Sequence, residues 1–499
     1  MLKRNNKDTD MTALNRKPKA VTPITKMSLS GNGNLQYLKS DKLMLIEIAT
    51  SVLYGKDQFY NSSDALYKNA LATISNLVST NQFDYIANTC LFSRKVMDMR
   101  SYPIAIVVEF ANALAKQNKH YANMRSLVRD VITRADELTE LYGYALKVFG
   151  DKKCIPLAIK KGVADAFNKF DAYQLGKYNG GSKSITFKDL LRIVHPTPCD
   201  ELHSDIFRKI MQENLETPYT WETEFSKNGQ LHVLEQKSKG QIWKELIDSN
   251  SLGYMAMLRN LRNIEQECDA STICKVAAFI ANPTQVARSK QFPYSFVTAN
   301  SNVTSSIFKN ATDEALKLSC ANIPNLGDKV CIIVDASGSM HGNAALQANI
   351  FASSIIAAHQ DSSVVDVVFF ANRAALLPNR KDLTTRTEFA LALARSGIGG
   401  GTDFSSALTA IANKKYDAVF ILSDGDVNPM DLKKANESQR DAYKIIFNFN
   451  ASPTTPIREK NAFFLCGLSG KIFQYLKYVK NLDGIVSLVD VPYGKYAGN

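Results

Sequence analysis

Carboxylate and hydroxyl side chains follow an apolar run in the stretch "KVCIIVDASGSM", from Lys329 to Met340. The apolar, largely β-branched part is typical of a buried strand, and Asp335, Ser337 and Ser339 come directly after it. Ligands of open α/β sheets bind beyond the carboxyl ends of the strands, so we expect these three side chains to face a binding crevice. Oxygen ligands of this kind suit a hard cation such as Mg²⁺ better than zinc.

Two later segments bring more oxygen atoms to the same kind of position. "GIGGGTDFSSAL" leads Thr402 out of a glycine-rich turn into a helical pattern, and "AVFILSDGDVNP" ends another apolar run in Ser423-Asp424-Gly425. The alternative is that Asp335 and the two serines only cap the following helix, as such residues often do. Three segments in this order favour a divalent cation, most simply Mg²⁺, held by Asp335, Ser337, Ser339, Thr402 and Asp424.

This arrangement resembles the metal-ion-dependent adhesion site of von Willebrand factor A domains. The resemblance rests on D-x-S-x-S after one strand, a threonine in a glycine-rich turn, and an aspartate in S-D-G after a later strand. It implies that Ser337, Ser339 and Thr402 bind the cation directly or through water, and that Asp335 and Asp424 act largely through water. It further implies that an acidic group of a partner completes the coordination.

The chain divides into three regions of different pattern. Residues 1–38 are polar and predict a partly disordered arm. Residues 39–326 carry apolar groups three and four apart in successive segments, which predicts stacked antiparallel helix pairs of an α-solenoid. Residues 327–499 alternate short apolar runs with amphipathic segments, which predicts a doubly wound α/β domain with a parallel sheet.

Composition favours a soluble protein with a polyanionic partner. Of the formal net charge of +12, residues 1–326 carry +10, and such a field attracts nucleic acid, although a basic surface kept for solubility would look the same. No apolar run is long enough to span a bilayer, so no membrane association is expected. The eight cysteines form no C-x-x-C pair, which predicts a reducing, cytoplasmic compartment.

The helical region resembles the TROVE module of telomerase, Ro and vault proteins. The resemblance rests on "SITFKDLLRIVHPTP" (184–198) and "KSKGQIWKELIDSNSLGYMAMLRNLRNI" (237–264), with weaker similarity in "VLYGKDQFYNSSDAL" and "QFPYSFVTAN". A TROVE module followed by a von Willebrand A-like domain is the architecture of the Ro autoantigen family and its bacterial relatives. It implies a monomeric ring of HEAT-like helix pairs closed by the A-like domain.

The same resemblance implies a function in RNA quality control. The ring would accept single-stranded 3′ ends of misfolded non-coding RNAs, and an outer basic surface would bind structured Y RNAs. An exoribonuclease such as polynucleotide phosphorylase is a possible partner of such a ribonucleoprotein.

Basic residues gather around the first of these stretches and predict the RNA contacts. Lysine and arginine bind phosphate without choosing a sequence, and Tyr173 and Tyr178 offer rings on which bases stack. The loop at Asn179–Gly181 is less basic than is usual in the family, which weakens the expectation of tight Y RNA binding. The predicted contacts are Lys160, Lys161, Lys169, Lys177, Lys183, Lys188, Arg192, His195, Arg259 and Arg262, although Arg259 and Arg262 fit a plain helix surface equally well.

Other chemistry finds little support in the sequence. His195, Cys199 and His203 are spaced four apart, but Pro196 and Pro198 separate His195 from any helix that holds the other two, so we expect no metal there. Known catalytic motifs are missing, so an enzyme is not expected, and a nuclease at the strand-end site would lack a general base. The alternative function is a protein–protein adaptor that acts through the A-domain cation.

Overall fold

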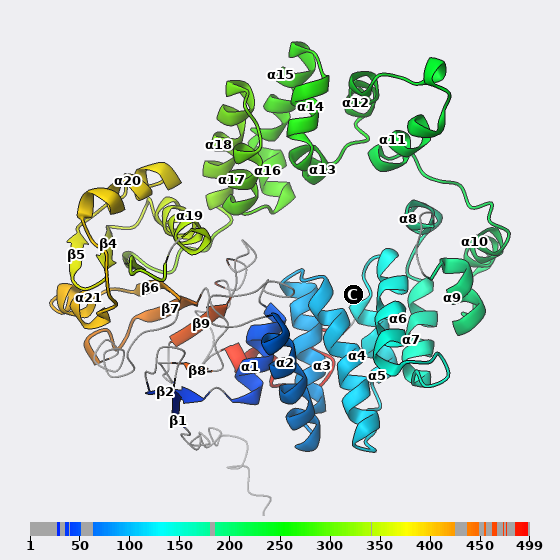
Figure 1. The fold of residues 1–499 in the computed structure, drawn as a ribbon, viewed down its shortest axis with the longest axis horizontal. Helices are drawn as coiled ribbons and strands as arrows, with labels where there is room; N and C mark the ends of the chain where they lie inside the picture. Colours follow the sequence, from blue (N-terminus) through cyan, green and yellow to red (C-terminus); the bar gives the residue numbers. More distant parts are fainter. Residues whose placement is uncertain are drawn as a thin grey trace, which may run out of the picture.

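The computed structural model describes residues 27–29, 35–38, 40–50, 63–179, 185–340, 342–424, 437–448, 454–455, 462–466, 473, 476 and 485–497. Helices follow one another in an arc that leads from the blue α1 to the green α18 and meets the α/β part at both ends (Figure 1). Within the described residues, no helix is both long and apolar enough to cross a membrane.

A first group of helices packs around a shared apolar core. Helix α4 shows why, because its sequence "SYPIAIVVEFANALAK" is apolar on nearly all sides and eleven of its residues are buried between neighbouring helices. The helices pack in pairs such as α2 with α4, α4 with α6, and α5 with α7. The bounds are α1 (Asp41–Thr50), α2 (Ser63–Ser79), α3 (Phe83–Leu91), the π-helical turn η2 (Phe92–Val96), α4 (Ser101–Lys116), α5 (Met124–Val131), α6 (Asp136–Phe149), α7 (Leu157–Phe167), α8 (Ala172–Tyr178), α9 (Phe187–Val194) and α10 (Glu201–Met211).

A second group of helices has a core of its own. Trp243 of this core packs against Trp221 and Phe225, with ring centroids 5.9 and 4.8 Å away, and so holds the otherwise exposed α11 to α12. The arc ends with α18, which packs against α15, α16 and α17. The bounds are α11 (Trp221–Gln230), the 3-10 turn η3 (Val233–Glu235), α12 (Lys239–Asp248), α13 (Tyr254–Arg259), α14 (Leu261–Glu267), α15 (Ala270–Ile280), α16 (Pro283–Ser289), α17 (Pro293–Ser301) and α18 (Ser306–Cys320).

The α/β part contains, among the described residues, a six-stranded sheet of order β5-β4-β3-β6-β7-β9. All neighbours pair in parallel except β5, which runs antiparallel to β4 at the edge. The central strands are buried along almost their whole length, as parallel strands covered on both faces must be. The strands are β3 (Lys329–Asp335), β4 (Val364–Phe370), β5 (Ala374–Leu377), β6 (Ala418–Ser423), β7 (Tyr443–Asn448) and β9 (Ala462–Cys466), and the helices are α19 (Asn343–Ala358), α20 (Arg386–Ser396), α21 (Phe404–Ile411) and α24 (Ile485–Val489).

The helical arc closes on this α/β part. At one end α17 and α18 contact α19, and at the other α1 contacts β9 and α24. The predicted fold class, a helical-repeat ring joined to an α/β domain, is therefore confirmed. One difference lies in the polar N-terminal region: β1 (Met27–Leu29) and β2 (Leu35–Leu38) form a hairpin that pairs with β8 (Thr454–Thr455), so part of the expected arm is strand.

Candidate cation site and nucleic-acid interface

The oxygen cluster predicted from the sequence lies where the order of the sheet reverses. The chain passes from β3 to β4 and β5 on one side and then returns to β6 on the other, so β3 and β6 are neighbours in space. Asp335 ends β3, and Asp424 follows the last residue of β6. Such a reversal is the usual ligand-binding crevice of an open α/β sheet.

Hydrogen bonds organise Asp335 and its neighbours. The Ser337 backbone N–H donates to Asp335 Oδ1 and the Ser423 hydroxyl donates to Asp335 Oδ2, each at 2.8 Å. The Ser337 and Ser339 hydroxyl oxygens lie 3.2 Å apart. Asp335 therefore holds the loop after β3 in the shape that brings both serine hydroxyls together.

The donor set fits a hard divalent cation. Asp335 and Asp424 are 2% and 4% exposed, so two carboxylates are buried at the ends of adjacent strands. Burial, helped by the charge of Asp424, raises the pKa of Asp335 to about 6. A cation would offset the cost of ionising both groups in this buried place, and hydroxyl and carboxylate oxygens are the ligands that Mg²⁺ takes.

The loop that carries Thr402 is held against the same site. Gly338 N–H donates to the Gly400 carbonyl at 2.9 Å, and Asp403 N–H donates to the Ala371 carbonyl at 2.6 Å. Gly400 has a φ of 109°, a backbone conformation that favours glycine. Thr402 itself is exposed. The Asp403 side chain accepts from the Ser405 N–H and hydroxyl, so it caps α21.

Helix α9 presents a basic face. Phe187, Leu190, Leu191 and Val194 are its buried side. The predicted contacts Lys188, Arg192 and His195 are four and three residues apart, so they share one face next to the buried side. Arg192 and His195 are exposed and Lys188 is half-buried.

Local interactions fix both ends of this basic face. A capping box joins Thr186 to Asp189 at the start of α9, where the hydrogen bonds from Thr186 lower the pKa of Asp189. At the other end His195 adopts a left-handed conformation with φ 47° and ends the helix. Lys188 forms an ion pair with Glu213 at 2.6 Å.

The other predicted lysines are placed differently. Lys161 is exposed and Lys160 is half-buried on α7, which packs against α9. Lys169 donates to the carbonyls of Arg129 and Ile132, and burial lowers its pKa to about 8, so it mainly closes the end of α5. The last two are Lys177, which lies 3.7 Å from Glu222, and Lys183, which falls outside the described residues.

Arg259 and Arg262 line a pocket of about 430 Å³ between α13, α14 and α17. Both side chains are exposed, and Asn263, Thr298 and Asn302 add polar groups to the walls. Of the two aromatic candidates, Tyr173 is 54% exposed, whereas the Tyr178 hydroxyl accepts from Arg134 at 2.7 Å. The structure thus places predicted basic residues on α7 and α9, two helices that pack together, and the two arginines at a separate pocket.

Comparison with known proteins finds a family match within the helical region. Residues 209–330 are similar to the TROVE domain, whose family model they match. The stretch 237–264 lies inside the match, and the stretch 184–198 lies before it.

Two curated proteins are also similar to this chain. Telomerase protein component 1 of Mus musculus is 22% identical over 370 residues, which cover 56% of this chain and 14% of that protein. The protein of the same name from Rattus norvegicus is 21% identical over 345 residues, which cover 53% and 13%. The chain therefore spans about a seventh of the length of these curated relatives.

A solved structure shows the same fold. The crystal structure of the Deinococcus radiodurans RO (RSR) protein matches with a TM-score of 0.61 at 14% identity, over 88% of this chain and 99% of that one. Together with the TROVE match, this confirms the resemblance to the Ro family and its bacterial relatives that the sequence predicted.

Two features escaped the sequence reasoning. Ser423 was read only as part of S-D-G, yet its hydroxyl donates to Asp335, and its place just before Asp424 was the available signal. The second is a cluster of Cys199, Asp200 and His203 at the start of α10. His195 lies outside α10, at the end of α9, as the sequence predicted. The third potential ligand beside Cys199 and His203 is Asp200.

Proposed function

We propose that this chain binds RNA without cleaving it. The observation that carries the proposal is the basic face of α9, where Arg192 and His195 are exposed beside the half-buried Lys188, on a helix that packs against the lysine-bearing α7. Positive groups spaced along one face bind a phosphate backbone and leave the base sequence unread. The excess of positive charge on residues 1–326 agrees with an extended RNA path.

The finer proposal follows the Ro pattern. Structured, Y-like RNA binds the outer basic surface, and single-stranded 3′ ends of misfolded RNA enter the ring, where Arg259 and Arg262 supply phosphate contacts. The protein acts in the cytoplasm as a monomer in RNA quality control, and an exoribonuclease is its partner. The ring fold and the pocket beside Arg259 and Arg262 support this proposal.

The test measures binding of the full-length protein to a structured RNA with a single-stranded 3′ tail, over a series of salt concentrations. Affinity should fall steeply with salt because phosphate contacts release counterions. The variant Lys188→Gln/Arg192→Gln should weaken binding and lower the slope of log affinity against log salt by about 2, one for each lost phosphate contact.

Lys415→Gln is the matched control, since Lys415 is exposed on the α/β part in the loop before β6. It should leave both affinity and slope unchanged. Salt-independent binding, or equal effects of the α9 variant and the control, would contradict the proposal. Sequencing the RNA that co-purifies with the protein identifies the natural ligand.

A second candidate function is a protein–protein adaptor that acts through the strand-end cation. The buried pair Asp335 and Asp424, with the hydroxyls of Ser337 and Ser339, favours it because hydroxyl-rich ligation leaves a cation able to attract an acidic group. Pull-down with the wild type and with Asp335→Ala, each with and without Mg²⁺, separates the two functions. Loss of protein partners with RNA binding retained would establish the adaptor.

A further inference from the structure

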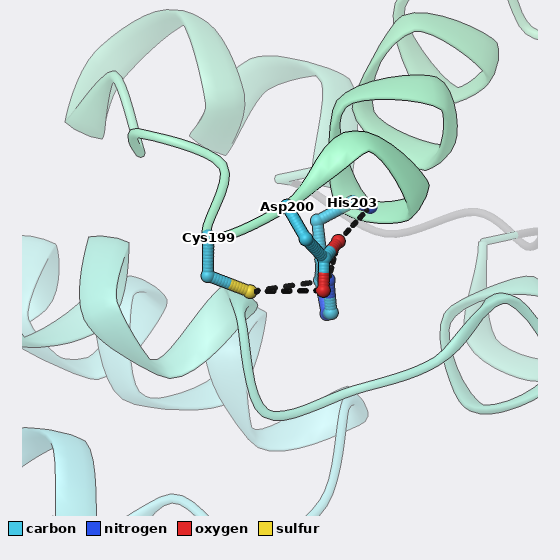
Figure 2. Close-up of side chains that lie close together, drawn as sticks. All are labelled: Cys199, Asp200 and His203. Atoms are coloured by element: carbon cyan, nitrogen blue, oxygen red, sulfur yellow. Dashed lines mark hydrogen bonds and ion pairs between the residues drawn. The ribbon is translucent and has the colours of Figure 1, made fainter.

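Three side chains of different chemistry point toward one another at the start of α10. Figure 2 shows the thiol of Cys199, the carboxylate of Asp200 and the imidazole of His203 around one point. Their ligand atoms all lie within 4.8 Å of one another. Within the part of the chain that the structure describes, no other group of three or more such side chains meets this condition.

The separations suit a tetrahedral ion. Cys199 Sγ lies 3.2 Å from His203 Nδ1 and 3.6 Å from Asp200 Oδ2. With usual bond lengths of about 2.0–2.3 Å, a tetrahedral zinc ion keeps sulfur about 3.5 Å from a nitrogen or oxygen ligand. His203 Nδ1 also lies 2.7 Å from Asp200 Oδ1, so coordination would exchange this hydrogen bond for two metal bonds.

The surrounding structure already holds the three ligands in place. Asn168 Nδ2 donates to the Thr197 carbonyl at 2.9 Å, and Asn168 Oδ1 accepts from the Cys199 N–H at 3.1 Å, so one side chain fixes the loop before α10. The edge of the His203 ring packs on Phe207, with centroids 6.2 Å apart. Little reorganisation is therefore needed when an ion binds.

Helix capping explains only part of this geometry. Asp200 Oδ1 accepts from the His203 N–H at 2.8 Å, as an N-cap residue does. Capping does not require a thiol on one side of the carboxylate or an imidazole on the other. Sulfur, imidazole and carboxylate together are the ligand set of zinc rather than of Mg²⁺.

We propose that Cys199, Asp200 and His203 bind a zinc ion that joins the loop before α10 to the first turn of that helix. Three protein ligands leave the fourth position to water or to an anionic oxygen. The site is exposed at Cys199 and Asp200, so an ion reaches it from solvent. It is separate from the strand-end cation site, which contains no sulfur or nitrogen ligand.

The test uses Co²⁺ as a spectroscopic substitute for zinc in the full-length protein, first freed of metal with a chelator. A thiolate bound to Co²⁺ produces a strong ligand-to-metal charge-transfer absorption, which oxygen ligands do not. We expect this absorption in the wild type, its loss on addition of Zn²⁺, and a rise in melting temperature with Zn²⁺. Cys199→Ser should abolish the absorption, and His203→Gln should weaken Co²⁺ binding by more than about 10-fold.

Two further variants separate ligation from folding. Asp200→Asn keeps an N-cap acceptor, so it should preserve the fold and still weaken binding of the ion. Asn168→Ala removes no ligand, but it frees the loop that holds Cys199 in place. It should therefore weaken binding of the ion about 10-fold. Circular dichroism of each variant checks folding.

Cys274→Ser, which changes another exposed cysteine, and Asp335→Ala, at the strand-end site, are controls that should keep the absorption. Lack of a charge-transfer absorption in the wild type, or its survival in Cys199→Ser, would overturn the proposal.

Discussion

Single residues of this protein show how burial changes the ionisation of a charged group. Asp335 and Asp424 are buried at adjacent strand ends. Burial raises the pKa of Asp335, because the charged carboxylate loses its hydration. No arginine or lysine is described in contact with Asp335, and its two oxygens accept hydrogen bonds from serine groups. A divalent cation bound at this site would supply a positive charge that offsets the cost of burying the two carboxylates.

Arg94 and Glu137 form the opposite case, because here the buried carboxylate has an arginine as its partner. Glu137 accepts from Arg94 and from the N–H groups of Thr133 and Arg134, while Arg94 also donates to the carbonyls of Met99 and Val131. Loss of hydration outweighs their attraction, since it raises the pKa of Glu137 and lowers that of Arg94. The pair therefore links η2 to α6 with all of its hydrogen bonds satisfied.

Arg94→Met should lower the free energy of unfolding by about 3–5 kcal/mol, because it leaves the buried Glu137 carboxylate without its hydrogen-bonded cation and with the more distant Arg100, whose Nε lies 3.9 Å away, as a positive neighbour. Denaturant unfolding at neutral pH measures this loss. Arg125→Met is the control: its ion pair with Asp165, at 2.6 Å, lies at the surface, where such pairs contribute less than about 1 kcal/mol. Equal losses in the two variants would contradict the argument.

At the scale of elements, α9 depends on its first residues for the shape of its basic face. Thr186 and Asp189 form a capping box that fixes the first turn of α9. This turn holds Lys188 in its place on the helix, in line with Arg192 one turn later. Thr186→Ala should cost about 1 kcal/mol locally. Faster hydrogen exchange in α9 and a modest loss of RNA affinity should follow.

Thr385→Ala tests whether the RNA effect belongs to α9. Thr385 caps α20 through the same kind of box with Glu388, but it lies in the α/β part. It should increase exchange in α20 by a similar amount and leave RNA affinity unchanged. A drop in RNA affinity with Thr385→Ala would mean that lost stability, not the α9 face, controls binding.

The sequence predicted elements better than it predicted side-chain partners. Apolar runs such as "VCIIV" indicated buried strands because burial on both faces needs apolar residues throughout, and β3 confirms this. Helical periodicity likewise indicated α9. The left-handed His195, the clamp of Asn168 on Cys199 and the hydroxyl bond from Ser423 to Asp335 depend on groups brought together by folding. No local pattern reports such contacts.

The N-terminal hairpin is a case in which the sequence pattern did not predict the elements themselves. Residues 27–38 are too short and too polar to indicate strands by periodicity. They become β1 and β2 because β8, more than 400 residues later, offers Tyr37 and Leu38 a pairing edge. Long-range pairing of this kind is visible only in the folded chain.

At the scale of the whole molecule, residues 485–497 are brought against the early helices of the arc. Asn88, fully buried on α3, donates to the Val491 carbonyl at 2.6 Å and to the Val489 carbonyl at 3.3 Å. Tyr496 packs edge-on against Phe92, and its hydroxyl donates to the Leu488 carbonyl at 2.8 Å. Residues 485–497 thus tie the α/β part to the start of the helical arc (Figure 1).

Asn88→Leu should loosen this connection, because it leaves the Val489 and Val491 carbonyls without their donor in a buried place. The expected cost is about 1–3 kcal/mol. Since the same contacts hold one end of the ring to the α/β part, hydrogen exchange and limited proteolysis should show lost protection at residues 485–497, while the core of β3 and β6 stays protected. Asn76→Leu, a matched change on the exposed surface of α2, should have neither effect. Unchanged protection of residues 485–497 in Asn88→Leu would show that apolar contacts such as that of Tyr496 with Phe92 close the ring by themselves.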